Sequence, residues 1–374
     1  MANNKKYWLG LALVSGLGPV QLSRALKIEG DPTRIWRASR KKLEYLIDST
    51  EAVDNLIKLR ENLDLEEKLK KIKAKKVDLI ARDEADYPEV LLEIHDPPPL
   101  LFVRGNISAS FPAVAVVGSR KSTGYGEKAA RELAGGLALR NIVVVSGMAH
   151  GIDREAHLGA LNEGGRTIAV LGSGHDHCYP RQNRDIFNRI PGQGAVISEF
   201  PPDVSPKAGN FPRRNRIISG ISQGVVVVEA AEKSGALITA SLGLDQNRDV
   251  LAVPGNIDRA SSRGCNDLLR QGAVPVTCPE DIINHLYSEF AGDSKSEEEE
   301  SVIIPPAFSP LEKRMIGIFN RERELTLEEL IAITGREAGE LSSLLVKFEV
   351  KGIITRRAGQ KYCFQGLQSL LKPI

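Results

Sequence analysis

Short apolar runs alternate with longer segments of helical periodicity between residues 113 and 290. The runs are rich in Val, Ile and Ala and lack polar alternation, so they are predicted to be strands buried on both faces of a sheet. They cover residues 113–117, 142–145, 167–171, 195–198, 225–229 and 250–253. Their alternation with helical segments predicts an α/β fold with a doubly wound, mostly parallel sheet.

The first 76 residues show helical periodicity, broken by glycine and proline at residues 16–19 and 30–32. We therefore predict a small all-helical domain over residues 1–76, followed by the central domain over residues 77–290. Residues 15–26 (SGLGPVQLSRAL) resemble one helix-hairpin-helix element, whose turn can donate backbone N–H groups to a DNA phosphate. A helical module used for packing or protein contacts is the favoured alternative, because one such hairpin alone binds weakly.

An acidic, proline-containing stretch, predicted to be a linker over residues 291–306, follows the central domain. The last predicted domain, residues 307–374, contains three helical segments at 310–320, 326–333 and 337–351 and then a hairpin at 353–364 around Gly359. Three helices and a β-wing resemble a winged helix-turn-helix. The third helix carries acidic as well as basic residues, so duplex recognition and a protein-docking or structural role both stay open.

The balance of charge narrows the search for a binding surface. The formal net charge of the 374 residues is only +2, so a nucleic-acid site must be a local concentration of Lys and Arg. The four cysteines are scattered without a CxxC pair, which argues against a zinc site and a disulfide framework and predicts a reducing cytoplasm. No apolar stretch reaches the roughly 18 residues of a membrane span or forms a signal peptide, so no membrane association is expected.

Nearly every predicted strand ends in small or polar residues, such as Ser146-Gly147 and Gly172-Ser173-Gly174. The carboxyl ends of parallel strands share one edge of the sheet, where ligands bind, so these endings predict a binding crevice. At Gly118-Ser119-Arg120 the first strand turns into a helix, whose free N–H groups and dipole, together with Arg120, would attract an anion. A purely structural turn is the alternative.

A basic cluster lies in residues 199–220, where Lys207, Arg213, Arg214 and Arg216 surround Phe211. Guanidinium groups bind phosphates while an aromatic ring can stack on a base, a combination typical of sites for single-stranded nucleic acid. The alternative is that Phe211 is a core residue and that one or two of the arginines pair with Glu199 or Glu229.

Two groups of residues have the chemistry of metal ligands but lack a fourth ligand at a standard spacing, so no metal and no other cofactor is predicted. These groups are His175, His177 and Cys178, and His150, Asp153 and His157. Instead, Asp153 is expected to cap the helix that begins near Arg154, and His157 to face the crevice or the sheet. No GxSxG elbow accompanies Ser146, so no catalytic residue is predicted.

A dozen motifs in a fixed order are similar to those of the DNA processing protein A family, also called Smf. They include VAVVGSR, VVSGMAHGIDREAH, TIAVLGSG, YPRQN, ISEFPP, FPRRNRIISG, VVVVEA, SGALITA, AVPGN and SRGCNDLLRQGA. The resemblance implies an extended Rossmann domain that binds single-stranded DNA, forms a homodimer and helps to load a RecA-type recombinase onto incoming DNA in natural transformation. Single-strand binding protein is a further candidate partner, and some family members carry a winged-helix domain.

The resemblance also indicates which residues contact DNA. The family's GSR turn corresponds to Gly118, Ser119 and Arg120. Its basic loop and FPxRNR segment correspond to Lys207, Phe211, Arg214, Asn215 and Arg216. The chain departs from the family pattern where GSGHDHCYP replaces the commoner glycine-leucine-aspartate before YP, so the resemblance assigns no role to His175 and His177.

A nucleotide-binding enzyme is the alternative function. Nucleoside-monophosphate phosphoribohydrolases have similar Rossmann domains, in which a PGGxGTxxE motif binds phosphate and supplies a catalytic glutamate. The corresponding stretch, SGALITA at residues 234–240, lacks that glutamate. A non-enzymatic protein is therefore predicted, with a bound mononucleotide left open.

Overall fold

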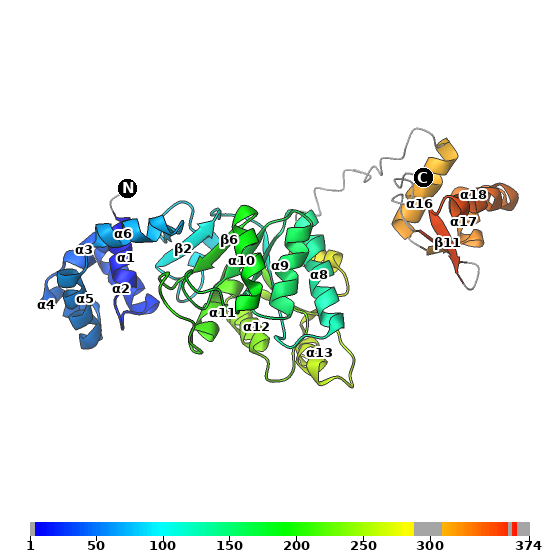
Figure 1. The fold of residues 1–374 in the computed structure, drawn as a ribbon. Helices are drawn as coiled ribbons and strands as arrows, with labels where there is room; N and C mark the ends of the chain where they lie inside the picture. Colours follow the sequence, from blue (N-terminus) through cyan, green and yellow to red (C-terminus); the bar gives the residue numbers. More distant parts are fainter. Residues whose placement is uncertain (1–3, 288–308, 323, 358–360, 365–374) are drawn as a thin grey trace. The chain divides into compact units, whose positions relative to one another are not determined.

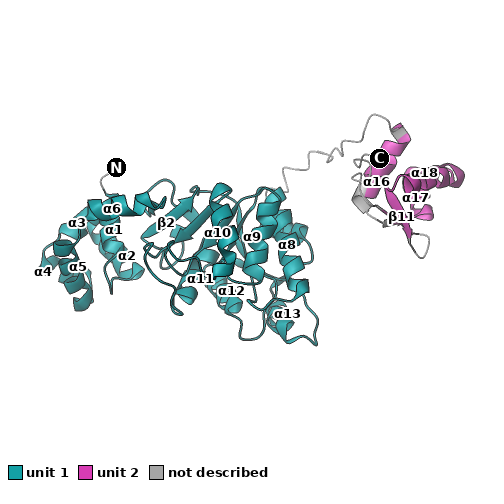
Figure 2. Ribbon diagram, viewed as in Figure 1, with its two compact units in different colours: residues 1–291 teal, residues 292–374 magenta. Residues whose placement is uncertain are grey.

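The computed structural model describes residues 4–287, 309–322, 324–357 and 361–364 (Figure 1). The chain divides into two compact units, residues 1–291 and residues 292–374 (Figure 2). The predicted linker at 291–306 and Gly359 of the predicted hairpin lie outside the described residues. The three-domain division therefore stays a prediction.

The first unit begins with a helical segment that packs around Trp8, Leu9 and Leu56. Its helices are α1 (Lys5–Ala12), α2 (Pro19–Glu29), α3 (Pro32–Arg37), α4 (Arg40–Leu46), α5 (Thr50–Asn62) and α6 (Leu65–Ala74). Side-chain caps fix where α3 and α6 begin, since Asp31 accepts a hydrogen bond from Thr33 N and Asp64 from Glu66 N and Glu67 N. The same core includes residues of the first two strands, so these helices pack directly on one edge of the sheet.

The nine-stranded sheet has the order β1-β2-β6-β5-β4-β3-β7-β8-β9. Its strands are β1 (Asp78–Ala81), β2 (Leu100–Gly105), β3 (Ala113–Val117), β4 (Val143–Ser146), β5 (Thr167–Val170), β6 (Ala195–Ser198), β7 (Gly224–Val227), β8 (Asp249–Ala252) and β9 (Val274–Pro275). All pairs from β6 to β9 are parallel, whereas β1 and β2 extend the sheet in antiparallel pairing. The predicted α/β fold with a mostly parallel sheet is confirmed.

Helices cover both faces of this sheet, as a doubly wound fold requires. They are α7 (Glu89–Leu92), α8 (Gly124–Leu139), α9 (Ile152–Asn162), α10 (Arg184–Arg189), α11 (Asn210–Gly220), α12 (Gly235–Asp245), α13 (Arg263–Arg270) and α14 (Pro279–Leu286), with short 3₁₀ turns η1 (Arg181–Asn183), η2 (Ile190–Gly192) and η3 (Ala260–Ser262). In β3, Val114 and Val116 join the core formed with α8, α9 and α14, whereas Ala115 and Val117 face the core formed with α11 and α12.

The order of the strands creates a switch point beside β3. The chain runs from β3 through β4 and β5 to β6 in one direction and then returns to place β7 on the other side of β3. Ligands of open α/β sheets bind where the connections diverge in this way, at the carboxyl ends of the strands. The turn at residues 118–120 follows β3, and Glu229 closely follows β7, so both lie at this point.

The described residues of the second unit form three helices and a small antiparallel sheet with the order β10-β12-β11. Its elements are α16 (Pro310–Glu322), β10 (Glu324–Thr326), α17 (Leu327–Thr334), α18 (Ala338–Val350), β11 (Ile354–Arg357) and β12 (Lys361–Phe364). The three predicted helices are present and pack around Phe319, Leu345 and Phe348. The winged-helix assignment itself stays a prediction.

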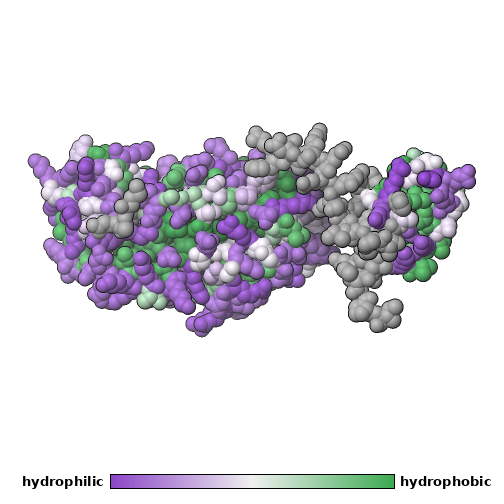
Figure 3. Space-filling model, turned by 90° about the horizontal axis from the view of Figure 1, so that it is seen from above, coloured by the Kyte–Doolittle hydropathy of each residue, from purple (hydrophilic) through white to green (hydrophobic). Residues whose placement is uncertain are grey.

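Polar side chains cover much of the face of the first unit seen from above, with apolar ones gathered near its middle (Figure 3). Across the described ranges of the chain, no helix combines the length and apolar character needed to cross a membrane.

Candidate nucleic-acid interface

The turn after β3 is packed so closely that position 118 requires glycine. A Cβ atom at Gly118 would lie 2.6 Å from Ile152 Cγ1 and 2.9 Å from the carbonyl oxygen of Glu229. Ser119 N donates a hydrogen bond to that same carbonyl (2.7 Å), and the carbonyl oxygen of Ser119 accepts one from Ile152 N (3.2 Å). The turn is therefore held between the end of β7 and the start of α9, with exposed Arg120 at its outer end.

The first turn of α8 is occupied by a carboxylate of the protein itself. Glu229 is buried, and its Oε2 accepts hydrogen bonds from Thr123 N (3.1 Å) and Thr123 Oγ1 (2.7 Å). Thr123 in turn caps α8 by accepting a hydrogen bond from Gly126 N (3.3 Å). The positive end of this helix is therefore compensated internally, and the expected contribution of its dipole to an anion site is not available. Arg120 remains as the cation at this turn.

A groove of about 380 Å³ lies at the switch point, and we call it the aromatic groove. Its walls are Arg120, Tyr179, Pro206, Ala208, Phe211, Pro212, Asn215, Gly235 and Ile238. The Arg120 guanidinium lies 5.4 Å from the centroid of the Phe211 ring, and the half-exposed Tyr179 ring lies 5.5 Å from it at an angle of 41°. Two rings and a cation in an open groove form a surface on which bases can stack.

Phe211 is neither a core residue nor fully exposed. Its ring lies over Gly172 at the end of β5, where a Cβ atom would come within 2.7 Å of Phe211 Cδ1. One face of the ring is thus fixed by the sheet edge while the ring still lines the groove.

Arg214 lies beneath the groove and has only 3% of its surface exposed. Its Nη1 donates hydrogen bonds to the carbonyl oxygens of Gly147 (2.6 Å) and Val170, and its Nε donates to Asn215 Oδ1 (3.2 Å). Burial lowers the pKa of this guanidinium to about 10, and nearby Asp153 partly offsets that effect. Arg214 therefore ties the ends of β4 and β5 to α11 and does not line the groove.

Arg213 and Arg216 form ion pairs with the buried carboxylate of Glu199. The Nη2 atom of each lies 2.9 Å from Glu199 Oε2, and Arg216 Nε also lies 2.8 Å from Asp96 Oδ2. Arg216 is buried, whereas Arg213 reaches the surface across the Phe200 ring. The alternative that one or two arginines of this segment pair with Glu199 is thus confirmed for these two residues.

The structure brings part of the predicted set together. Arg120, Phe211 and Asn215 line the groove, and exposed Lys207 lies between two wall residues, Pro206 and Ala208. The remaining members of the set, Gly118, Ser119, Arg214 and Arg216, form the turn and the buried support behind it.

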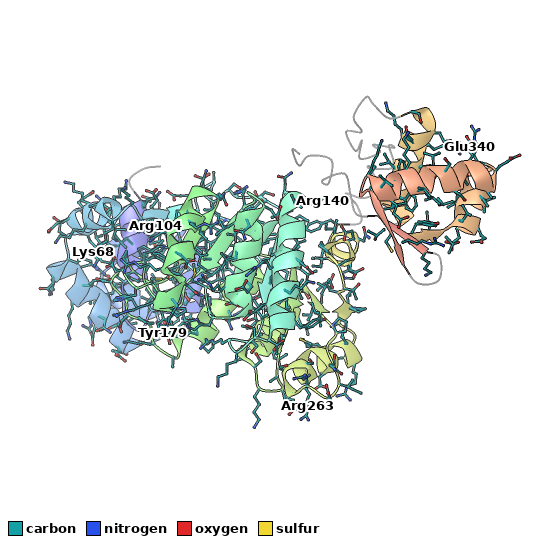
Figure 4. The ribbon with its side chains drawn as sticks, turned by 45° about the vertical axis from the view of Figure 1, so that its right-hand side comes forward. Lys68, Arg104, Arg140, Tyr179, Arg263 and Glu340 are labelled. Atoms are coloured by element: carbon teal, nitrogen blue, oxygen red, sulfur yellow. The ribbon has the colours of Figure 1, made fainter. Side chains whose placement is uncertain are left out.

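Tyr179 is a groove residue that the sequence reasoning did not single out. It belongs to the YPRQN motif, whose aromatic and basic residues were a usable signal. A second cavity of about 770 Å³ shares Tyr179 and Pro206 with the groove. Arg104, Arg181 and Arg184 line this cavity, so basic side chains continue beyond the groove; Arg104 and Tyr179 are labelled in Figure 4.

His157, His175 and Asp153 are buried and make structural hydrogen bonds. His157 Nδ1 lies 2.7 Å from Thr167 Oγ1 against the sheet, as predicted, and burial lowers its pKa to about 3. His175 Nε2 donates to the carbonyl oxygen of Val196 (3.0 Å), and burial lowers its pKa to about 4. The prediction that Asp153 caps a helix is wrong, because α9 begins after Gly151 and Asp153 accepts a hydrogen bond from Ala149 N (3.2 Å). Among the described residues, no three His, Cys, Asp or Glu side chains are placed to hold a metal ion.

Comparison with known proteins shows which family this chain belongs to. Residues 78–287 match the sequence model of DNA recombination-mediator protein A. The protein Smf of Synechocystis is 32% identical over 396 residues, covering 97% of this chain and 99% of that protein. The protein Smf of Escherichia coli is 49% identical over 211 residues, which cover 56% of each chain.

Two solved structures are similar in fold and sequence. DNA processing protein A of Streptococcus pneumoniae superposes with a TM-score of 0.67 at 34% identity, covering 75% of this chain and 98% of that one. The Helicobacter pylori protein superposes with a TM-score of 0.52 at 29% identity, covering 57% and 97%, and its structure is described as showing a unique mode of single-stranded DNA binding. Because the family model matches more than half of the chain and a full-length relative is 32% identical, this chain belongs to the DNA recombination-mediator protein A family.

Proposed function

We propose that this chain binds single-stranded DNA in the aromatic groove and presents it to a RecA-type recombinase without itself catalysing a reaction. The observation that carries the proposal is the grouping of the Arg120 guanidinium, 5.4 Å from the centroid of Phe211, with the half-exposed Tyr179 ring at the switch point of the sheet. The single-stranded DNA binding described for the Helicobacter pylori relative supports it.

The chemistry of the groove favours a single strand over a duplex. Bases stacked within a duplex keep their faces covered, whereas a single strand can turn its bases toward Phe211 and Tyr179. Exposed Arg120 lines the groove, and exposed Lys207 lies in the chain between the wall residues Pro206 and Ala208, so both can neutralise phosphates of a bound strand.

Each residue of the site then has its own role. Phe211 and Tyr179 stack on bases, Arg120 and Lys207 contact phosphates, and the Asn215 amide pairs with a base edge or a sugar. Gly118 and Ser119 shape the turn that carries Arg120. Arg214 and Arg216 hold α11 in place from within the protein and act on DNA only through that helix.

The membership of the chain in a family of recombination mediators supports a recombinase partner. We further propose that the chain works as a homodimer in the cytoplasm and acts on DNA coated by single-strand binding protein. If so, it shortens the lag before a RecA-type ATPase assembles on coated single strands, and Phe211→Leu lengthens that lag again. An unchanged lag with and without the protein would contradict the loading role.

The binding role is tested by competition between single-stranded and blunt duplex DNA of equal length for the full chain. We expect the single strand to bind more tightly at every salt concentration, with an affinity that falls as salt rises. Equal or tighter binding of the duplex would contradict the proposal.

A nucleotide-processing enzyme is the second candidate, because Gly235 and Ile238 of the SGALITA segment line the groove. That segment contains no acid to act as a catalyst. Two glutamates precede it: Glu229 is buried with its carboxylate bound to Thr123, and Glu232 is exposed and pairs with Arg263. Incubation with nucleoside monophosphates followed by chromatography distinguishes the two, because only the enzyme releases free base.

A further inference from the structure

Two loops carry the walls of the aromatic groove, and both lie next to a helix that is far from them in sequence. The first loop, residues 173–178, leads from β5 to Tyr179. The second, residues 199–206, leads from β6 to Pro206. Helix α6 of the helical segment at the amino terminus contacts both loops through two lysines, Lys68 within the helix and Lys75 at its C-cap.

The two loops are hydrogen-bonded to each other. Gly174 N donates to the carbonyl oxygen of Val204 (2.7 Å), and Asp176 N donates to that of Pro202 (3.0 Å). The ring of His177 adds a third link, from Nε2 to the carbonyl oxygen of Asp203 (3.2 Å). The loops are therefore tied together, and a contact that holds either loop also helps to place Tyr179 and Pro206.

Helix α6 holds the loops at two points. Lys75 Nζ lies 2.5 Å from Asp176 Oδ2 on the first loop, and Lys68 Nζ lies 3.0 Å from Asp203 Oδ2 on the second (Lys68 is labelled in Figure 4). The lysines are seven residues apart, so they extend from the same face of the helix about two turns apart. The hydrogen bond from Lys68 is the largest cause of a lowered pKa at Asp203.

Charges, more than close packing, make this contact. An open surface groove of about 410 Å³ lies along α6 and the second loop, and its walls include Lys68, Ile72, Lys75, Pro202 and Asp203. The ion pairs bridge this space, so removing them frees the loops where apolar contact between helix and loop is incomplete.

From these contacts we infer that Lys68 and Lys75 are positioning residues for DNA binding, which act through Asp176 and Asp203 on the loops that wall the groove. The inference rests on the proposed single-strand binding. Carboxylates near a DNA site would repel phosphates. The inference explains why Asp176 and Asp203 are found there, because each is paired with a lysine.

Removing the two carboxylates distinguishes a positioning role from a direct electrostatic effect, because the two predict opposite changes in DNA affinity. Asp176→Asn with Asp203→Asn removes two negative charges near the groove, which would strengthen DNA binding if only the local potential mattered. Loss of the positioning contacts predicts the opposite, a weakening of about two- to tenfold, because each exposed ion pair accounts for no more than a few-fold. Asp48→Asn is the matched control, since Asp48 pairs with Arg24 on the helical segment away from both loops.

A charge exchange provides the rescue. Lys68→Asp and Lys75→Asp combined with Asp176→Lys and Asp203→Lys restore both pairs in reverse, and we expect affinity within about twofold of the parent. Hydrogen exchange at Gly174 N and Asp176 N should speed up in the asparagine variant and slow again in the exchanged one. Thermal unfolding of each full-length variant establishes that it is folded.

The inference is overturned if the asparagine variant binds single strands as tightly as the parent or more tightly. It is equally overturned if that variant binds weakly and the exchanged variant does not recover, because the loss then comes from the substituted side chains themselves. Phe211→Leu is measured in parallel. Parent-like binding by Phe211→Leu would count against the groove as the DNA site, a failure distinct from that of the positioning role.

Discussion

Arg120 and Arg214 have different roles in the aromatic groove. Arg120 is exposed, lies 5.4 Å from the centroid of the Phe211 ring and can reach a phosphate. Arg214 is buried and satisfies the carbonyl oxygens at the ends of two strands, so its charge stabilises the sheet edge on which the groove is built. A single substitution at each position distinguishes a residue that contacts DNA from one that supports the sheet edge.

Arg120→Ala should flatten the slope of log affinity against log salt by about 0.7, the contribution of one single-strand phosphate contact, with little effect on the melting temperature. Arg214→Ala should instead lower the melting temperature, because each buried carbonyl left unpaired costs about 1–3 kcal/mol. Its folded fraction should keep the parent's salt slope. Thermal unfolding and a salt series on both variants check this, and a flattened slope at unchanged stability for Arg214→Ala would refute the assignment.

Phe211→Leu tests stacking separately from packing. Leucine keeps apolar contact with Gly172 but has no ring to stack on a base, so we expect a loss of about 1–3 kcal/mol in single-strand affinity without a change in salt slope. Tyr125→Leu serves as the control, since Tyr125 is an exposed aromatic residue outside the groove walls. Equal losses from both variants would show that the effect is not specific to the groove.

Some residues of the groove could be predicted from the sequence and others could not. Glycine at 118 and an aromatic residue among arginines at 211–216 follow from chain chemistry and were found. Arg214 is buried because it meets the carbonyl oxygens of Gly147 and Val170, and Arg216 because it meets Glu199. These partners are distant in sequence, so the sequence could not predict which arginines of the segment are buried. Tyr179 was visible in the sequence but was read only as part of a motif.

At the scale of elements, the buried parallel strands were predictable because their apolar runs contrast with the helices around them. The strands β3 to β8 lie within two residues of the predicted ranges. The strands β1, β2 and β9 were missed. The first two precede residue 113, where the first strand was predicted, and β9 has only two residues. The pairing of these strands depends on tertiary contacts that no local pattern records.

Helix α16 contains an acid whose ionisation stabilises the second unit. Glu312 Oε2 accepts a hydrogen bond from Ser309 N (2.7 Å), and Glu312 N donates one to Ser309 Oγ (3.3 Å). The other carboxylate oxygen, Oε1, lies 2.7 Å from Lys347 Nζ on α18. The hydrogen bond from Lys347 is the largest cause of a lowered pKa at Glu312, to about 2. Because the folded-state pKa is below the unfolded value of about 4.3, this stabilisation is complete above that value and is lost as pH falls toward 2.

We therefore expect peptides of α16 and α18 to exchange amide hydrogens progressively faster, relative to intrinsic rates, as pH is lowered from about 5 to 2. Glu312→Gln should start with faster exchange at pH 5 and change less across this range. Hydrogen exchange with mass spectrometry reports on these peptides in the full chain. A variant with the parent's pH dependence would show that Glu312 does not determine it.

At the scale of the whole molecule, the two units have separate cores. The core of the second unit is formed by residues between Met315 and Ile354, whereas the groove is built entirely from the first. A chain truncated at Ser294, which lies outside the described residues, should therefore fold and bind single strands with the parent's affinity. Gel-shift titration of the truncated chain checks this. Loss of binding by a folded truncated chain would place the main DNA site in the second unit.

The most direct measurement is photocrosslinking of the full chain to single-stranded DNA containing iododeoxyuridine, which reacts with aromatic residues stacked on it, followed by peptide mapping. If bases stack in the aromatic groove, crosslinks form at Phe211 and Tyr179 and disappear when unlabelled single strand competes. Crosslinks confined to residues 15–26 or to the second unit, with none at Phe211 or Tyr179, would contradict the account.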